Sequence, residues 1–240
     1  MAGYDTAGEI QNTYVSAHDE FGADPNFWMR YFAPSPAADL FEDDPSAECS
    51  GAWDSGGPHI GCISAPSQGN LSSTSAQGTA DAETFAAAIQ SAYYAVTPLD
   101  LPSNNILICW LDQEYSTTLS LSYWDAWANY IANYNFADLG TYPLYPGLYC
   151  TPESPYPNCS TIAQATGLDI PYAVWSAEWE PCGGLASPPA WDAQACSTVP
   201  TKLWQYGEQG ACGYSANVDL DEGAPGFNNA DYCLVVVSNP

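Results

Sequence analysis

Two acidic residues directly follow an apolar segment near the middle of the chain. The run ILICWLDQE places Asp112 and Glu114 one residue apart, after six mostly apolar residues. In an extended strand, residues i and i+2 point to the same side, about 6.6 Å apart along the backbone. A buried strand that ends in this way can present both carboxyl groups to one cleft. Such pairs carry out general acid and base chemistry.

Two further acids lie at the ends of the first and last strand candidates. Asp5 closes the segment AGYD, and Asp219 lies in NVDLD. If the strands close into a barrel, the first and last strands are neighbours, and these two acids face Asp112 and Glu114 across its mouth. Several carboxyl groups around one cleft suit glycoside hydrolysis, which needs a protonated acid for the leaving oxygen and an ionised one for the oxocarbenium-like transition state.

The elements that would position these acids alternate along the chain. Short apolar or aromatic segments predict eight strands, at 2–5, 27–32, 59–64, 106–112, 144–150, 172–177, 202–206 and 217–221. Helical patterns occupy 79–96, 120–134, where Ser120 is suited to capping, and 159–168. This alternation favours one domain over residues 1–240, a parallel (β/α)₈ TIM-type barrel that is incomplete in its last helices.

The nine cysteines indicate an oxidising compartment, because the chain has no CxxC metal spacing. Proximity in sequence predicts four short disulfide loops, Cys49–Cys62, Cys150–Cys159, Cys182–Cys196 and Cys212–Cys233, with Cys109 left as a buried thiol. Residues 33–58 and 180–200, rich in Pro, Gly, Ser and Cys, are interpreted as loop insertions stapled by such bonds. We therefore expect a secreted, extracellular protein that has lost a leader segment.

Acidic residues outnumber basic ones by 28 to 2, which gives a net charge of −26. Only Arg30 and Lys202 are basic, so nucleic acid and anionic membrane surfaces are not expected as partners. No segment has the roughly 20 apolar residues of a membrane helix. The sequence pI of about 4.1 leads us to expect adaptation to acid surroundings. Only 12% of residues are charged, which leaves room for self-association near pH 4.

No cofactor and no metal are expected. His18 and His59 have no nucleophile context and are interpreted as structural, and no His or Cys cluster has ligand spacing. The acidic run DLDEG can bind Ca²⁺ in principle, but its spacing is not that of an EF-hand loop. Asp221 and Glu222 in this run are interpreted as loop residues.

The ordered segments GYDTA, LDQE, GLYC, AVWSAEW and LWQYGE…NVDLD resemble glycoside hydrolase family 25, the lysozyme-type muramidases, and the related glycoside-hydrolase-like domain family of unknown function. The resemblance spans nearly the whole chain and implies a (β/α) barrel that cleaves β-1,4 bonds in peptidoglycan. It implies that Glu114 is the general acid and that Asp112 stabilises the transition state or orients the acetamido group of the substrate. Asp5 and Asp219 match further acids of the family.

The residues predicted to contact the polysaccharide substrate are Arg30, Tyr31, Tyr149, Trp175, Trp204 and Tyr206. The aromatic rings offer flat surfaces for sugars, and Arg30 can either pair with an acid of the cleft or form a structural ion pair. The expected function is a secreted glycoside hydrolase acting on an amino-sugar polymer. The alternative is a non-catalytic extracellular protein with the same barrel, which binds carbohydrate or self-assembles.

Overall fold

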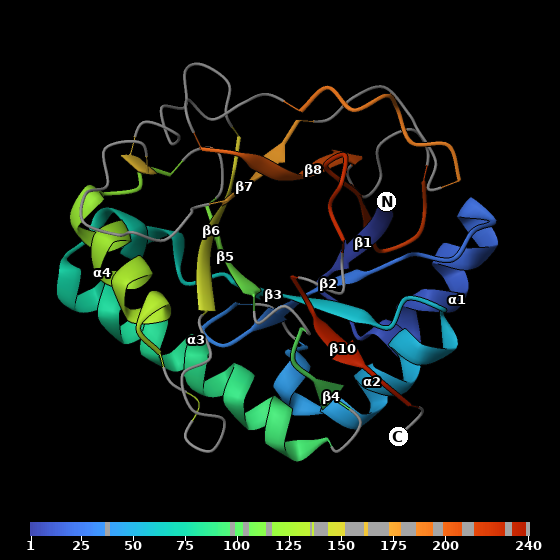
Figure 1. Ribbon diagram of the computed structural model, residues 1–240, viewed down its shortest axis with the longest axis horizontal. Helices are drawn as coiled ribbons and strands as arrows, with labels where there is room; N and C mark the ends of the chain where they lie inside the picture. The colour runs from blue at the N-terminus through green and yellow to red at the C-terminus, as the bar shows by residue number, and fades with distance from the viewer. Residues whose placement is uncertain are drawn as a thin grey trace.

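The computed structural model of this 240-residue chain forms a closed barrel of eight strands. It describes residues 1–36, 39–96, 99–102, 106–113, 117–134, 136, 144–151, 161–162, 173–178, 186–193, 199–207, 214–228 and 232–238. The barrel strands are β1 (Ala2–Thr6), β2 (Trp28–Phe32), β3 (His59–Ser64), β5 (Leu107–Asp112), β6 (Leu144–Cys150), β7 (Ala173–Ala177), β8 (Thr201–Gly207) and β9 (Asp219–Gly223). They form the ring in Figure 1. All eight predicted strands are present, and the predicted TIM-type barrel is confirmed.

The last barrel strand runs in the opposite direction to the others. β1, β2, β3, β5, β6, β7 and β8 are paired in parallel, whereas β9 is antiparallel to both β8 and β1. The prediction of a wholly parallel barrel was therefore wrong for this strand. Because β9 is antiparallel to β8, it begins at the end of the barrel at which β8 finishes. Its first residues consequently lie beside the last residues of β1.

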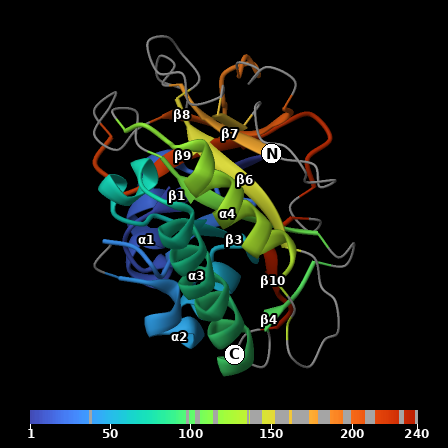
Figure 2. The same cartoon turned by 90° about the vertical axis from the view of Figure 1, so that its left-hand side faces the viewer.

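Four α-helices cover the side of the barrel that is formed by β1 to β6 (Figure 1). They are α1 (Ile10–Phe21), α2 (Pro45–Asp54), α3 (Ser75–Ala95) and α4 (Leu121–Ala132). Figure 2 shows α3 and α4 side by side on the barrel. The predicted cap of α4 is confirmed, because the Ser120 hydroxyl accepts a hydrogen bond from the Tyr123 N–H at 3.2 Å. The short elements are η1 (Phe41–Asp43), η2 (Gln68–Ser72), β4 (Leu99–Asp100) and β10 (Leu234–Val236), which pairs with β3 and β4.

Residues 33–58 contain a helix that the composition did not predict. α2 begins after Asp44, whose side chain accepts from the Ala47 N–H at 3.1 Å, and Pro45 occupies its first turn. Gly51 lies in the middle of this helix, where a β-carbon would come within 2.6 Å of the Gln11 backbone nitrogen on α1. The glycine that made the segment look like a loop therefore permits two helices to approach closely. The predicted helix 159–168 lies mostly outside the described residues.

The strands separate two apolar layers. On β5, Leu107, Cys109 and Leu111 face outward into the layer under the helices, and Ile108 and Trp110 face into the barrel. This alternation follows from the two-residue period of a strand. The barrel interior is filled by Phe27, Met29, Ile63, Ile108, Trp110, Ala173, Trp175, Leu203 and Phe227. The interior is thus a packed core, and pockets open at its two ends.

The cysteines of the described elements are thiols. Cys49, Cys62, Cys109, Cys150 and Cys233 are free and buried, so the buried thiol at Cys109 is confirmed. The disulfides Cys49–Cys62, Cys150–Cys159 and Cys212–Cys233 were wrong. Short sequence separation suggested loop closure, but α2, β3 and β6 are regular elements that fix where their cysteines point. The pair Cys182–Cys196 lies outside the described residues.

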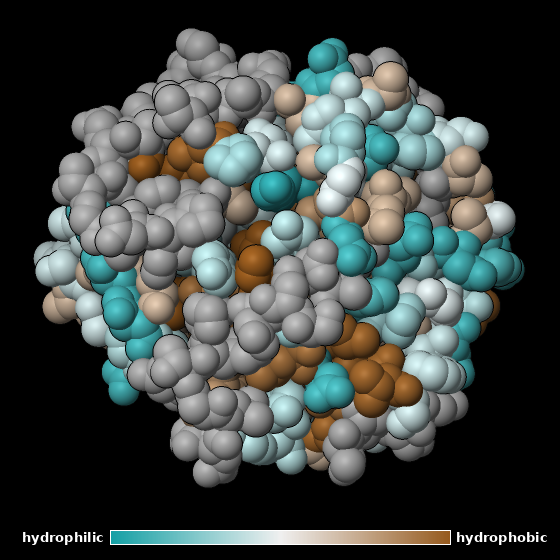
Figure 3. All heavy atoms as spheres, in the orientation of Figure 1, coloured by the Kyte–Doolittle hydropathy of each residue, from teal (hydrophilic) through white to brown (hydrophobic). Residues whose placement is uncertain are grey.

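Among the residues coloured in Figure 3, polar ones are spread over much of the surface, and a group of hydrophobic residues lies at β10. Val237, directly after this strand, is 52% exposed. Among the helices that the structure describes, none has the length and hydrophobicity needed to cross a membrane. The predicted self-association remains a prediction.

Candidate active site

The carboxyl ends of the parallel strands bring together polar side chains from five strands. Those that face inward at this end are Asp5 on β1, Tyr31 on β2, Asp112 on β5, Tyr149 on β6 and Gln205 on β8. Asp219 joins them because β9 is antiparallel and begins at this end, with its backbone opposite Asp5. The predicted meeting of the first-strand and last-strand acids is therefore present.

One amide nitrogen connects the two acids. Gln205 Nε2 donates to Asp5 Oδ2 at 2.7 Å and to Asp219 Oδ2 at 3.2 Å. The amide is held in this orientation because the Tyr149 hydroxyl donates to Gln205 Oε1 at 2.7 Å. The backbone carbonyl of Gln205 also accepts from the Glu178 N–H. The side chain is thus fixed at both ends, and so are the carboxyl groups that it contacts.

A further acid lies one layer deeper in the barrel. Asp221, opposite Gly3 in the β1–β9 pair, is 0% exposed, and its Oδ1 accepts from Trp175 Nε1 at 3.0 Å. Trp175 packs edge-on against Tyr149, with ring centroids 4.7 Å apart. The prediction that Asp221 is a loop residue was wrong, because β9 continues to Gly223. Trp175 is buried below the mouth rather than lining it.

The grouped carboxyls change one another's acidity. Burial raises the pKa of Asp5 well above its usual range, and the negative charges of Asp219, Asp221 and Asp112 add to the rise. The hydrogen bond from Gln205 opposes it. Burial also raises the pKa of Asp221, with a further contribution from Asp219. The environment therefore favours a protonated carboxyl among these acids at a pH where a solvated one is ionised.

Asp112 ends β5 on the inner face and is buried. Its backbone carbonyl accepts from the Gln68 side chain at 3.3 Å, and the next N–H, that of Gln113, donates to the Tyr149 carbonyl at 3.1 Å. These contacts fix the end of the strand. Glu114 lies outside the described residues. Its role as general acid and that of Asp112 remain predictions.

A pocket of about 80 Å³ opens beside Asp5. It is lined by Asp5, Thr6, Ala7, Tyr31, Asn217, Val218 and Asp219. The Thr6 hydroxyl donates to the Asn217 carbonyl at 2.9 Å, which joins the two segments that form its walls. Tyr31, half-buried here, is placed where a substrate can meet it.

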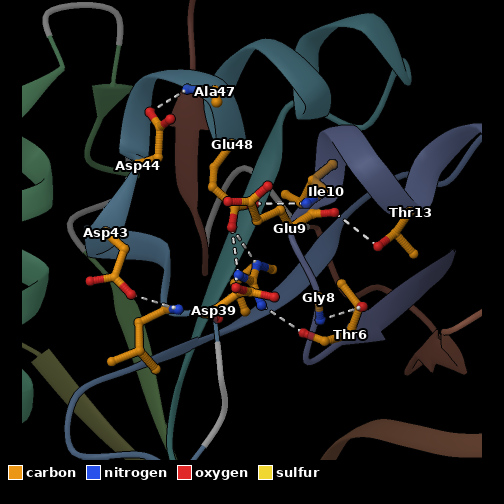
Figure 4. Close-up of polar contacts among 12 residues, drawn as sticks. Thr6, Gly8, Glu9, Ile10, Thr13, Asp39, Asp43, Asp44, Ala47 and Glu48 are labelled. Carbon is orange, nitrogen blue, oxygen red and sulfur yellow. Dashed lines mark hydrogen bonds and ion pairs between the residues drawn. The ribbon is translucent and has the colours of Figure 1, made fainter.

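Arg30 lies outside this pocket, on the outer face of β2. Its guanidinium pairs with Glu48 of α2 and donates to the backbone carbonyls of Thr6 at 2.8 Å and Asp39 at 3.0 Å. Figure 4 shows Glu48 between these groups and the start of α1, where its Oε2 accepts from the Ile10 N–H at 2.9 Å. Both partners are fully buried. This placement thus supports a structural ion pair. It does not support contact between Arg30 and a substrate.

Trp204 and Tyr206 also lie on the outer face of the barrel. They pack in the outer apolar layer, with ring centroids 5.8 Å apart, and Trp204 Nε1 donates to the Glu178 carbonyl at 2.9 Å. The residues of β8 that face inward are Leu203 and Gln205. The prediction selected the aromatic residues of the strand and thereby the wrong face. Neither ring reaches the mouth to stack on a sugar.

Lys202, the other cation, lies at the opposite end of the barrel. It lines a second pocket, of about 200 Å³, with residues from the beginnings of β6 and β7, such as Tyr145 and Ala173. Its ammonium lies 6.0 Å from the ring centroid of Tyr232. Since Arg30 is paired with Glu48, neither basic side chain of the protein faces the acids. Within the described ranges, no group of three His, Cys, Asp or Glu side chains is arranged to hold a metal ion.

Sequence reasoning missed Gln205 and Asp221. The signal was present, because each is a polar residue at an inward position of a strand whose other inward residues are apolar or acidic. In LWQYG, the inward position is given by Leu203, two residues before Gln205. In VDLDE, Asp221 follows Asp219 at the same spacing.

Comparison with known proteins identifies the fold. No family model matches the chain, and no curated protein matches it. An uncharacterized protein of B. stearothermophilus has a similar structure, with 19% identity, a TM-score of 0.71 and coverage of 97% of this chain and 100% of the other. The spore cortex lytic enzyme SleM of Clostridium perfringens is 16% identical, with a TM-score of 0.50 and coverage of 92% of this chain and 66% of the other. A family 25 glycosyl hydrolase from Bacillus anthracis is 13% identical, with a TM-score of 0.45 and coverage of 94% of this chain and 89% of the other. At these identities, the likeness to the first two structures shows the fold.

Proposed function

We propose that this protein is a glycoside hydrolase that cleaves an amino-sugar polymer, with peptidoglycan as its substrate. One observation carries the proposal: Asp5, Asp112, Asp219 and Asp221 converge at the carboxyl end of the barrel strands. In this fold, that end is where the loops after the strands build active sites. No basic side chain of the described chain neutralises the four acids.

The chemistry follows from the different environments of the acids. Cleavage of a glycosidic bond requires a proton for the leaving oxygen and negative charge near the sugar ring. Asp112 and Asp219 supply negative charge at the mouth. Glu114, two residues beyond Asp112, donates the proton, in agreement with the family resemblance of LDQE. Tyr31 and the pocket beside Asp5 provide a place for the substrate.

The fold is compatible with this substrate. SleM, which shares the barrel, is a spore cortex lytic enzyme. We extend a lytic activity of that kind to this chain because the acids, and not the fold alone, are suited to it. Secretion is part of the proposal, since peptidoglycan lies outside the cytoplasmic membrane. The cysteine count no longer supports secretion, because the described cysteines are thiols.

Activity at acid pH also belongs to the proposal. With a net charge of −26 at pH 7, the enzyme repels an anionic polymer near neutrality. This repulsion weakens toward about pH 4, where carboxyl groups take up protons. The raised pKa of Asp5 is compatible with work in this range, because the acid cluster then carries less than its full charge.

Release of soluble fragments from purified peptidoglycan and from chitin oligomers tests the proposal, measured from about pH 3 to pH 7 around the carboxyl pKa values. We expect activity with an acid optimum. Glu114→Gln lowers kcat by about 100-fold or more, because the proton donor is lost, and Asp112→Asn lowers kcat without a large change in KM. Glu83→Gln, an exposed residue of α3, is the matched control and retains full activity.

Absence of fragment release by the folded wild-type protein on every substrate and at every pH contradicts the proposal. Binding of the same oligomers without turnover then identifies the alternative, a non-catalytic carbohydrate-binding protein. Retention of activity in Glu114→Gln contradicts the assignment of the proton donor but not the hydrolase.

A further inference from the structure

The carboxyl groups of Asp5 and Asp221 are neighbours in the wall of the barrel. In the antiparallel β1–β9 pair, Asp5 lies opposite Asp219 and Gly3 lies opposite Asp221. Asp5 and Asp221 are therefore diagonal neighbours on the inner face, a relation in which side chains interact. Asp5 is 4% exposed and Asp221 is 0% exposed. The two acids thus occupy neighbouring buried positions on the inner face.

The remaining contacts of the two carboxyls leave them facing each other. Gln205 occupies Asp5 Oδ2, and Trp175 occupies Asp221 Oδ1. Asp221 Oδ2 is buried and meets no N–H or O–H donor of the described residues. Its diagonal neighbour across the strand pair is the Asp5 carboxyl, whose pKa is raised by the charge of Asp221 in addition to burial. Ionised carboxylates only accept hydrogen bonds, so these two groups can bond to each other only when one of them carries a proton.

No other source of positive charge is at hand. Arg30 is on the outer face with Glu48, and Lys202 lines the pocket at the opposite end. Two adjacent carboxylates that are both buried and both ionised are strongly unfavourable, and a proton shared between them relieves this.

We propose that Asp5 and Asp221 form a buried acid pair that holds a single proton between them, so that the two residues together contribute one negative charge to the site. Asp221 does not reach the pocket and acts through Asp5, which makes it a positioning residue. It keeps one carboxyl of the mouth in hydrogen-bonding, partly neutral form while the others ionise. The pair does not depend on the proposed function, but its effect on catalysis does.

Other titratable groups face the pair from neighbouring strands. They are Asp219 on β9, Asp112 on β5, Tyr149 on β6 and Tyr31 on β2, with Tyr206 on the outer side of β8. Asp219 and Asp112 add negative charge and so strengthen proton uptake by the pair. Burial and the charge of Asp221 raise the pKa of Tyr206, so this phenol stays neutral throughout the range in which the pair titrates. Glu114 lies outside the described residues.

Carboxyl-resolved ¹³C NMR titration of the aspartate-labelled full chain tests the pair without any substrate. In the wild type we expect the Asp5 and Asp221 signals to titrate together, at a midpoint well above that of a solvated aspartate. In Asp221→Asn, the Asp5 midpoint falls by about 1 to 3 pH units because a like charge is removed. Glu222→Gln, on the same strand but directed to the other face, leaves both midpoints in place.

A second variant preserves both acids in case Asp221→Asn perturbs folding. Trp175→Phe removes the N–H that stabilises the ionised form of Asp221, together with part of the ring, so the midpoint of the pair rises. Trp110→Phe, the ring beside Trp175 with centroids 6.0 Å apart, is the matched control and does not move it. Independent titration of Asp5 and Asp221 near normal values overturns the proposal, as does an Asp5 midpoint that is unchanged in folded Asp221→Asn.

Fragment release assays separate this result from the proposed function. If the wild type hydrolyses peptidoglycan, Asp221→Asn shifts the pH profile of kcat while KM changes little. If the wild type hydrolyses nothing, the NMR titration still decides whether the pair exists.

Discussion

Gln205 donates its side-chain amide to Asp5 across the β8–β9–β1 part of the barrel, at 2.7 Å. The same nitrogen contacts Asp219, and the Tyr149 hydroxyl prevents the amide from turning over. A lysine or arginine at this position would neutralise both acids. A glutamine orients them and leaves their charge in place, which suits a site whose chemistry depends on carboxyl groups.

Replacement of Gln205 by leucine is expected to destabilise the protein at pH 7 by about 1 to 3 kcal/mol, because the buried carboxyl of Asp5 and the half-buried carboxyl of Asp219 lose a donor. This loss of stability becomes smaller near pH 4, because a protonated carboxyl depends less on a hydrogen-bond donor than an ionised one. Urea unfolding at both pH values measures this. Gln90→Leu is the control, since Gln90 likewise accepts from a tyrosine, Tyr134, at 2.7 Å, but contacts no acid. Equal pH dependence in the two variants contradicts the prediction.

The stability of the wild type is expected to fall as the pH rises above about 4. The folded pair of Asp5 and Asp221 keeps a proton that the unfolded chain has already released, since the pKa values of both groups are raised by burial and by neighbouring acids. For each such proton, the free energy of unfolding falls by about 1.4 kcal/mol per pH unit until the folded group ionises. Burial also raises the pKa of Glu42 and Glu48, which adds to the trend.

Unfolding free energies measured in steps from about pH 4 to pH 8 test this pH dependence. Asp5→Asn flattens the curve, because the asparagine does not titrate. A stability maximum at or above about pH 7.5, outside the range of carboxyl titration, would contradict both this prediction and the expected adaptation to acid.

Loss of Arg30 is expected to cost about 3 to 5 kcal/mol of stability in Arg30→Met, because Glu48 is left buried without its partner. The double variant Arg30→Met/Glu48→Leu recovers most of the loss. The exposed pair of His18 with Asp24 provides the control, and His18→Gln changes stability by less than about 1 kcal/mol. A double variant as unstable as Arg30→Met refutes the burial argument. Urea unfolding at pH 7 compares the four proteins.

The described thiols are expected to resist alkylation in the native protein. Burial raises the pKa values of Cys49, Cys150 and Cys233 to about 12, so little reactive thiolate forms. After unfolding without a reductant, mass spectrometry should find these residues, together with Cys62 and Cys109, labelled as free thiols. Recovery of a Cys49–Cys62 peptide joined by a disulfide would reverse the correction made above.

The barrel was predictable because strand signals are local. Each strand combines apolar or aromatic residues with a turn signal, and all eight were found near their observed bounds. The direction of β9 was not predictable, because the sequence pattern of a short strand is the same for both orientations. Its orientation depends on the strands with which it pairs. α2 was missed because Gly51 and Pro45 resemble loop residues until the contact with α1 is known.

The site was predictable to the extent that it depends on strand ends. Asp5, Asp112 and Asp219 lie at the mouth, as expected from their place in the pattern. The choice of Trp204 and Tyr206 failed because aromatic character was used in place of strand parity, which assigns the inner face to Gln205. Arg30 was ambiguous in sequence, because its partner Glu48 lies in the helix that was not predicted.

The pairing of β1 with β9 has a consequence for how the protein matures. Residues 2–5 pair with residues 219–222, so closure of the barrel joins two segments that are far apart along the chain. Contacts so distant along the chain form late and slow folding. During synthesis, Asp5 therefore meets Asp219 and Asp221 only after the residues between β1 and β9 have emerged. The acid cluster is assembled in the closing step, and until then no intermediate has to accommodate its repulsion.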